Sequence, residues 1–250
     1  MSSNDRQDQI LKLLTTNDYM TVEELSRTLG VSKVTIRSYL TVMEQKGLLF
    51  RTHGGAMIPE SKGLSRSISN TMQELDKEKD NIAKAAVQLI GTNDVVLIDS
   101  GSTCLHLARY LKDKQITLVS NSLLLIDALK DDTCIDIVGL GGTLKRSVMG
   151  MTGPMAISDV SKIHADILFL GATGYTNSGI FSSNLAEAEL KQCMIDASDK
   201  VCFLADSSKY GTKALAHISS WENIDIFITD NIAPELREAL EQKGVEVVTG

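Results

Sequence analysis

Short, continuous apolar runs recur through the last two thirds of the sequence, each followed by a loop of small or polar residues. Val95-Val96-Leu97-Ile98 and Ile167-Leu168-Phe169-Leu170 are two such runs, and both have the length of a strand. Segments with helical spacing lie between the runs. Strands that are apolar on both faces leave no side for solvent, so they belong in a mostly parallel sheet with helices over both faces. The pattern predicts an α/β domain.

The same criterion divides this part of the sequence into individual strands and helices. We expect strands at 95–99, 116–120, 134–139, 167–170, 201–205, 224–229 and 245–248. We expect helices near 82–89, 105–111, 123–129, 185–197 and 234–243. No repeat of fixed period is present.

The first 57 residues show a different, helical pattern. A helix is expected at 5–16, and a second begins at Thr21, where Thr21-Val22-Glu23-Glu24 fits a capping box. Gly30 stands where that helix should end with a positive φ, and Ser32 caps a third helix to Lys46. Residues 48–56 fit a hairpin. This order predicts a winged helix-turn-helix.

In such a fold the third helix enters the major groove, and the wing reaches the backbone or minor groove. The residues expected to face DNA are Ser32, Lys33, Thr35, Arg37, Ser38, Tyr39, Arg51 and His53. Arg37 could read a guanine or contact a phosphate, and both roles remain open. The alternative is a small helical module for packing or dimerisation.

The chain is expected to divide into a head at 1–57, a linker at 58–76 and a second domain at 77–250. The linker is polar and rich in turn-forming residues. The net charge of -7 by itself argues against nucleic-acid binding. Divided between the two parts of the chain, however, the charge is +1 for residues 1–57 and -8 for the remainder. To bind DNA, a near-neutral head depends on the positions of its few basic side chains, which must reach the phosphates.

Four loops at the expected ends of strands could bind an anion. They are 99–103, 139–143, 171–174 and 206–211, rich in glycine and hydroxyl residues, with Lys209 in the last. A glycine after a strand is also a common turn. Leu144 stands where G-x-G-x-x-G needs its last glycine, and no P-loop motif occurs, so no dinucleotide or ATP cofactor is expected. A small phosphorylated metabolite remains the candidate.

Composition excludes several other classes. The four cysteines, Cys104, Cys134, Cys193 and Cys202, are far apart and have no histidine cluster near them, so neither disulfides nor a metal site are expected. The N-terminus lacks the apolar segment of a signal peptide, and no apolar run approaches a membrane span. A cytoplasmic protein with no membrane partner is expected.

The head resembles the winged helix-turn-helix of the DeoR family of bacterial regulators of sugar metabolism. The resemblance is carried by Thr21–Leu25, Leu29–Ser32, Thr35-Ile36-Arg37 and Arg51–Ala56, in that order. One departure stands out: after Arg37 the family usually has a second Arg and then Asp, where this chain has Ser38 and Tyr39. This departure affects the expected operator preference rather than DNA binding itself.

The second domain resembles the C-terminal sensor domain of the same family. The matching segments are 99–103, 120–121, 141–142, 171–174 with Gly179, 187–194 and 206–209. That domain is similar in fold to ribose-5-phosphate isomerase and typically binds sugar phosphates. The resemblance therefore implies an effector site made of Asp99, Ser100, Gly101, Ser102, Thr103, Asn121, Gly141, Gly142, Thr173, Gly174, Glu187, Lys191 and Lys209.

Within this set the resemblance implies different roles. Ser102, Thr103, Thr173 and Lys209 are assigned to phosphate or hydroxyl groups, Asp99 and Asn121 to sugar hydroxyls, and Glu187 with Lys191 to the rim. Glu187 and Lys191 could instead form an exposed i,i+4 helix pair. Asp99 could instead cap the following helix.

We therefore expect an effector-controlled transcriptional repressor of a sugar operon, without catalytic residues. It would bind double-stranded operator DNA and a phosphorylated sugar as a homo-oligomer, a dimer or a tetramer. The alternatives are a sugar-phosphate isomerase with an attached head, for which Asp99, Glu187 and Lys209 are candidate groups, and a pure assembly domain.

Overall fold

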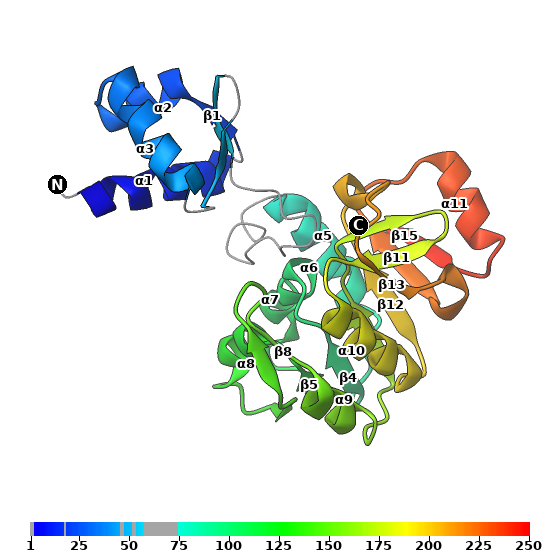
Figure 1. The fold of residues 1–250 in the computed structure, drawn as a ribbon. Helices are drawn as coiled ribbons and strands as arrows, with labels where there is room; N and C mark the ends of the chain where they lie inside the picture. Colours follow the sequence, from blue (N-terminus) through cyan, green and yellow to red (C-terminus); the bar gives the residue numbers. More distant parts are fainter. Residues whose placement is uncertain (1–2, 18, 46–47, 52–53, 58–74) are drawn as a thin grey trace. The chain divides into compact units, whose positions relative to one another are not determined.

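A computed structural model describes residues 3–17, 19–45, 48–51, 54–57 and 75–250. The chain forms two compact units, Met1–Ser61 and Lys62–Gly250 (Figure 1). We call the first unit the head and the second the sensor domain. The expected linker at 58–76 and the positions Lys46 and His53 lie wholly or largely outside the described residues.

Within the described residues, the head has three helices and a three-stranded antiparallel sheet in the order β1-β3-β2. Its elements are α1 (Ser3–Asn17), β1 (Tyr19–Thr21), α2 (Val22–Leu29), α3 (Lys33–Gln45), β2 (Phe50–Arg51) and β3 (Gly55–Met57). The expected hairpin is present as β2 and β3. Sequence reasoning missed β1, because a three-residue strand is too short to show a period of two.

Local signals in the head are confirmed. The Thr21 hydroxyl accepts the backbone N–H of Glu24 at 3.1 Å, and the Glu24 carboxylate accepts the N–H of Thr21 at 2.8 Å. Gly30 has φ 63°, so helix α2 ends in the left-handed conformation expected of it. The Ser32 hydroxyl accepts the N–H of Thr35 at 3.1 Å at the start of α3. On α3 the apolar side chains of Ile36, Leu40 and Met43 are fully buried.

The sensor domain is built on a seven-stranded sheet in the order β15-β14-β12-β9-β4-β5-β6, and every neighbouring pair is parallel. Its strands are β4 (Val95–Ile98), β5 (Ile116–Ser120), β6 (Ile135–Gly139), β9 (Ile167–Leu170), β12 (Val201–Leu204), β14 (Ile226–Thr229) and β15 (Glu246–Thr249). All carboxyl ends therefore lie at one edge, which is where ligands bind in such sheets. The mostly parallel α/β fold is confirmed.

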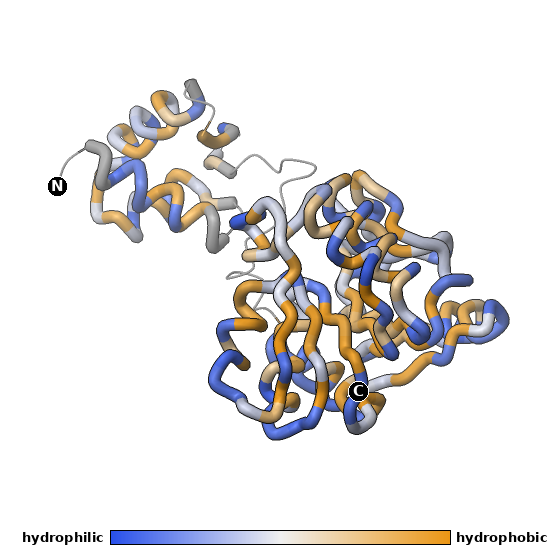
Figure 2. Tube along the Cα trace, turned by 90° about the horizontal axis from the view of Figure 1, so that it is seen from below, coloured by the Kyte–Doolittle hydropathy of each residue, from blue (hydrophilic) through white to orange (hydrophobic). Residues whose placement is uncertain are grey.

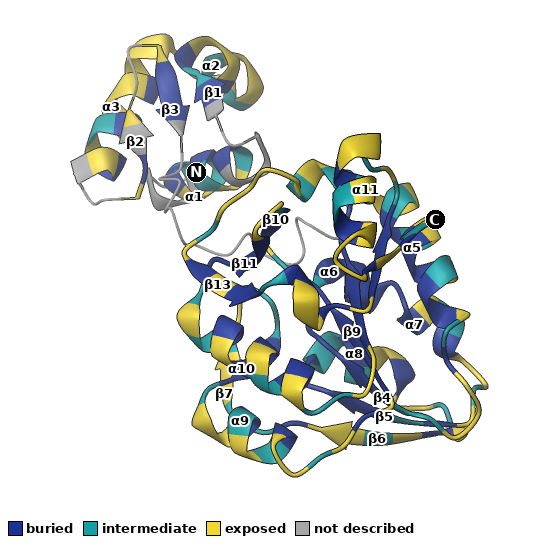
Figure 3. Ribbon diagram, turned by 90° about the vertical axis from the view of Figure 1, so that its right-hand side faces the viewer, coloured by how far each residue is buried: buried dark blue, intermediate teal, exposed yellow. Residues whose placement is uncertain are grey.

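Helices cover both faces of this sheet. One face packs against α5 (Asp76–Val87), α6 (Ser102–Leu105), α7 (Ala108–Leu111) and α8 (Leu123–Leu129). The other packs against α9 (Pro154–Val160), α10 (Leu185–Asp196) and α11 (Pro234–Glu241). The central strands are buried between these layers (Figure 3). Apolar and polar residues alternate along the helices (Figure 2), as one-sided packing requires.

Several short elements were not anticipated. A hairpin of β7 (Thr143–Lys145) and β8 (Gly150–Thr152) follows β6. A second small antiparallel sheet holds β10 (Gly174–Thr176), β11 (Gly179–Ser182) and β13 (Ala216–Ser219). Two short 3-10 helices, η1 (Ser207–Lys209) and η2 (Trp221–Asn223), precede β13 and β14 respectively. The expected strand 224–229 therefore starts two residues late, because η2 runs up to it.

The helix expected near 105–111 is interrupted. Its segments α6 and α7 are four residues each, and His106 and Leu107 form the turn between them. The N–H groups of His106 and Leu107 donate to carbonyls three residues back, at 3.2 and 3.1 Å, a tighter geometry than the α-helix. The dipole of a four-residue helix is small, so the dipole of α6 offers little attraction to an anion.

No helix within the described residues has both the length and the apolar character needed to cross a bilayer.

Candidate functional site

The outward face of α3 carries the side chains expected to meet DNA. Lys33, Thr35, Arg37 and Ser38 are exposed, as is the capping residue Ser32. Tyr39 differs, because it is half-buried and packs against the core of the head. The structure thus leaves Tyr39 in a supporting position beside the exposed face.

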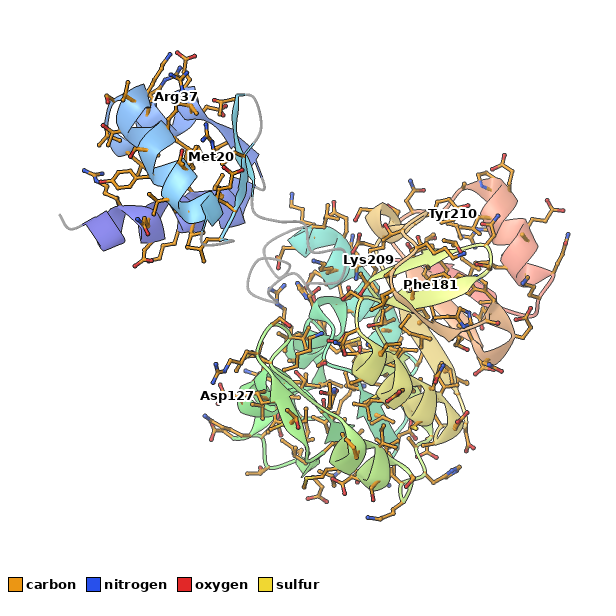
Figure 4. The ribbon with its side chains drawn as sticks, viewed as in Figure 1. Met20, Arg37, Asp127, Phe181, Lys209 and Tyr210 are labelled. Carbon is orange, nitrogen blue, oxygen red and sulfur yellow. The ribbon has the colours of Figure 1, made fainter. Side chains whose placement is uncertain are left out.

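Arg37 and Lys33 are not equally available. The Lys33 ammonium forms an exposed ion pair with Glu23 at 3.0 Å, and this contact lowers the pKa of the Glu23 carboxyl. The Arg37 side chain is exposed on α3 (Figure 4), and its guanidinium forms no hydrogen bond or ion pair with another described residue. A phosphate or base edge can therefore engage Arg37 without displacing an internal partner among these residues.

Arg51 of β2 forms hydrogen bonds that connect the wing with α3. Its guanidinium donates to the hydroxyl of Thr41 at 2.8 Å, and its backbone N–H donates to the Glu44 carboxylate at 3.4 Å. The side chain is nevertheless exposed. Val34, which sequence reasoning did not select, is 73% exposed on α3. An outward apolar residue beside Arg37 is the signal that would have found it, since such groups contact thymine methyls.

The centre of the sensor domain holds a buried ion pair between Asp99, after β4, and Lys191 of α10. The two residues are 2% and 7% exposed. The Lys191 ammonium also donates to the carbonyl of Gly171 at 2.9 Å, and the N–H of Gly171 donates to the Asp99 carboxylate at 3.2 Å. Asp99 therefore does not cap α6, whose cap position is Gly101 without a side-chain bond.

Glu187 pairs with the hairpin rather than with Lys191. Its carboxylate lies 2.6 Å from the Lys145 ammonium and accepts the Ser182 hydroxyl at 3.0 Å. Glu187 is 8% exposed. The alternative of an exposed i,i+4 pair is wrong, because each side chain is buried with a different partner. Lys145 was missed because its partner is 42 positions away in sequence.

Lys209, labelled in Figure 4, is a second cation, and its charge interacts with that of Lys191. Its ammonium donates to the Ala172 carbonyl at 3.1 Å and lies 3.9 Å from the Asp206 carboxylate. Burial lowers the pKa of Lys209, and Asp206 opposes that shift. The Lys209 side chain is partly exposed, and an ammonium with one hydrogen bond retains donor capacity for an anion.

Three buried polar atoms at the same edge of the sheet have no hydrogen-bond partner among the described residues: Thr103 Oγ1, Asn121 Oδ1 and Ser183 Oγ. Thr103 follows β4 and Asn121 follows β5. The Asn121 amide donates to the Ser100 hydroxyl at 3.3 Å, which links their two loops. Unpaired buried groups are costly, and a ligand that bonds to them removes the cost. Ser183 was not selected from the sequence.

Glycines let the loops approach one another closely. A Cβ on Gly150 would lie 2.5 Å from the Ser100 hydroxyl, so the hairpin β7-β8 packs against the loop after β4 only because residue 150 has no side chain. A Cβ on Gly101 would come within 3.5 Å of the Gly171 backbone. Loops from strands β4, β6 and β9 are thereby brought to one place.

The other predicted residues make contacts with neighbouring parts of the fold. Gly141 donates its N–H to Asp159 of α9 at 3.0 Å, and Gly142 packs against the backbone of Thr152. Gly174 packs against Thr212. Thr173 uses its hydroxyl to accept the N–H of Ser183 at 3.1 Å. Ser102 is buried at the start of α6.

The cysteines are free: Cys104 and Cys202 are buried, and Cys134 is exposed. Burial raises the pKa of the Cys104 thiol, which makes that thiol unreactive. Cys134, Asp113 and Asp132 lie close together. The Asp132 carboxylate accepts two backbone N–H groups there, both at 2.9 Å, and so has a structural role in the turn.

These two units define a class of protein: a regulator with a helix-turn-helix head and a separate domain of α/β fold. The DeoR-like helix-turn-helix domain family matches residues 6–62, and the DeoR C-terminal sensor domain family matches residues 74–231. The chain belongs to the DeoR family of transcriptional regulators, and it is a regulator rather than an enzyme.

Relatives along the full length agree. The regulator GlpR of Haloferax volcanii is 36% identical over 98% of this chain and 97% of its own. The regulator GolR of Listeria innocua is 34% identical over 96% and 94%, and the repressor GlcR of Bacillus subtilis is 30% identical over 99% and 96%. The crystal structure of ribose 5-phosphate isomerase A from Neisseria gonorrhoeae is 24% identical, covers 54% of this chain and 53% of its own, and has a TM-score of 0.40.

Proposed function

We propose that this regulator is a repressor of a sugar uptake or catabolism operon and that a phosphorylated sugar controls its affinity for operator DNA. The observation that carries the effector proposal is the cluster of Lys191, Lys209 and unpartnered Thr103, Asn121 and Ser183 atoms at one edge of the sheet. Cations suit a phosphate, and paired carboxylates with hydroxyl and amide oxygens suit sugar hydroxyls.

The loop 99–103 is the proposed phosphate contact. The first amides of α6 have no partner within the helix, so they are available to an anion. Ser100, Thr103 and Lys209 add hydroxyl and ammonium donors. Asp99 and Asn121 are proposed to bind sugar hydroxyls, and Glu187 with Lys191 to form the rim of the site.

The remaining predicted positions belong to the same proposal in other ways. Gly101 and Ser102 contribute backbone amides. Gly141, Gly142, Thr173 and Gly174 are proposed to shape the loops around the ligand, because their contacts are with neighbouring backbone or with α9.

On the DNA side, Arg37 is proposed to make the main contact of α3, joined by Ser32, Lys33, Thr35 and Ser38. Arg51 and, on the sequence alone, His53 are proposed to contact the backbone from the wing. One near-neutral head offers few phosphate contacts, so we propose a homo-oligomer that places two heads about 34–36 Å apart on operator half-sites. A regulator of this kind acts in the cytoplasm, where the operator lies.

A thermal-shift panel tests the effector proposal. The probes are ribose 5-phosphate, glucose 6-phosphate, fructose 6-phosphate, fructose 1-phosphate and dihydroxyacetone phosphate, with unphosphorylated fructose as the control. At least one phosphorylated sugar should raise the melting temperature, and Lys209→Met should abolish that shift. No shift with any member would favour a pure assembly domain and would overturn the proposal.

Operator binding tests the control step. Fluorescence anisotropy with an operator duplex, selected from fragments of the source genome, should show an affinity that changes with each sugar phosphate that binds. A lower affinity indicates induction and a higher one co-repression. Effectors that bind without changing operator affinity would contradict the sensor role.

A further inference from the structure

The buried side chain of His106 is not among the proposed effector contacts. It lies in the turn between α6 and α7 and is 3% exposed. Its Nδ1 is 2.9 Å from the carbonyl oxygen of Ser102, and its Nε2 is 3.0 Å from Oδ1 of Asp76. Ser102 belongs to the proposed phosphate loop, and Asp76 is the first residue of α5. One ring therefore joins these two places.

Both partners of the ring are hydrogen-bond acceptors. A carbonyl oxygen and a carboxylate each need a donor, and a neutral imidazole has one N–H to offer, whereas an imidazolium has two. Moving Ser102 or Asp76 away would leave a polar nitrogen of a buried ring without its partner, which is costly. The positions of Ser102 and Asp76 are therefore energetically coupled through His106.

The start of α5 depends on such contacts. Arg109 of α7 donates to Asp76 and to Asp80, one turn later, each at 3.0 Å. The cap position, Leu75, has φ 53° and makes no side-chain cap bond. A non-glycine residue in this conformation is strained, so the first turn of α5 is held by α7 and His106 rather than by its own cap.

The position of α5 in the sequence suggests a role for the contact between His106 and Asp76. Residues 58–74 join the head to the sensor domain in sequence, and α5 follows at once. A change in the first turn of α5 acts on the point at which the chain from the head enters the sensor domain. The buried side chain of His106 contacts both the proposed effector loop and that entry point.

We infer that His106 is the positioning residue that couples occupancy of the 99–103 loop to the start of α5, and through it to operator affinity. This inference rests on the proposed effector site. An anion bound by the loop amides reorients the peptide that carries the Ser102 carbonyl. The ring follows its acceptor, and the His106–Asp76 contact then differs between the free and bound states. An effector that binds these two arrangements unequally shifts the equilibrium between them.

Hydrogen–deuterium exchange of the full chain tests the coupling. The probe is inorganic phosphate at saturation, repeated with the five sugar phosphates named above. In the wild type, peptides covering 99–106 and 76–82 should both change exchange on binding. In His106→Leu, the 99–106 response should remain and the 76–82 response should disappear. Equal 76–82 responses in both proteins would overturn the inference alone.

Asp76→Asn covers the case in which His106→Leu fails to fold, because the Asp76 side chain is half-exposed. It should also lose the 76–82 response. His164→Leu is the matched control: His164 contacts Asp199 at 3.1 Å, but both side chains are exposed. It should behave as wild type. If no probe alters 99–106 in the wild type, the proposed effector site fails, and the inference fails with it.

Fluorescence anisotropy with operator DNA distinguishes coupling from a purely structural role of His106, because only coupling changes the effect of the sugar phosphate on operator affinity. In the wild type, the sugar phosphate with the largest thermal shift should change operator affinity by about 5- to 150-fold. In Asp76→Asn this ratio should approach one, while the affinity for the sugar phosphate stays at its wild-type value. A ratio that stays at the wild-type value, or one that falls only because the sugar phosphate no longer binds, would contradict the inference.

Discussion

Charged groups are used in opposite ways in the two units. In the head, Arg37 and Lys33 are exposed, and the ion pair of Lys33 with Glu23 is open to solvent. In the sensor domain, Asp99 and Lys191 are buried and share backbone partners. An exposed charge adapts to a large, hydrated partner at little internal cost, whereas a buried pair fixes the shape of a small site. Mutation of these charged residues should therefore change the affinity for DNA when it is made in the head, and the free energy of unfolding when it is made in the sensor domain.

The largest expected effect comes from breaking the buried pair. Asp99→Asn leaves the Lys191 ammonium without its carboxylate and should lower the free energy of unfolding by about 3–5 kcal/mol. Urea unfolding can be followed by the fluorescence of Trp221, the single tryptophan, which is fully buried in the sensor domain. Asp127→Asn breaks an exposed pair with Lys130 and should change stability by less than about 1 kcal/mol. Equal losses in the two variants would remove the distinction between the units.

Arg37→Ala should weaken specific operator binding by about 1–3 kcal/mol without changing the stability of the head. Anisotropy at fixed salt measures the loss. If Arg37 contacts a base, binding to non-specific duplex is unchanged; if it contacts a phosphate, both affinities fall and the salt slope decreases by about 1. Lys162→Ala removes an equal charge from the exposed surface of the sensor domain and should have no effect. Unchanged operator affinity in Arg37→Ala would refute the assigned role.

Thr21→Ala removes the capping box at the start of α2 and should destabilise the head by about 1 kcal/mol. Trp221 lies in the other unit, so hydrogen exchange of α2 amides is the suitable measurement. Thr28→Ala changes an exposed residue near the end of the same helix and serves as the control. Identical exchange in both variants would show that the cap contributes nothing.

An effect of similar size is expected when the pH is lowered. A hydrogen bond from Tyr110, supported by Lys84 and Arg109, lowers the pKa of Asp80 from 3.8 to about 2. A carboxyl with a lowered pKa in the folded state adds stability that is complete above its unfolded pKa and is lost as the pH falls toward the folded value. We expect about 1 kcal/mol, after allowance for solvent screening, to disappear between pH 4 and about pH 2. Asp80→Asn should flatten this part of the Trp221-monitored profile, and an unchanged slope would contradict it.

Local signals in the sequence were sufficient for most of the fold. The capping box at Thr21, the positive φ of Gly30 and the apolar strand runs each depend on neighbouring residues, so each could be predicted. The hairpin β7-β8 could not, because its strands are three residues long and its position depends on the contact of Gly150 with Ser100, 50 positions earlier.

The site was predictable by residue type and less so by partner. Asp99, Glu187 and Lys191 were selected, yet the i,i+4 spacing paired the wrong two. The choice of partner is tertiary: Lys191 reaches Asp99, and Glu187 reaches Lys145. The interruption of the helix at His106 was equally invisible, since 105–111 has an unbroken helical pattern in sequence.

Asp99 and Lys191 lie 92 positions apart in the chain. Contacts of such long range form late, because the intervening strands must first assemble. The head has its own core within the first 61 residues and can fold while the sensor domain is still on the ribosome. A nascent regulator therefore has a folded DNA-binding unit before the buried pair in its second domain can form, so under the proposed function its first encounters with DNA precede the effector site.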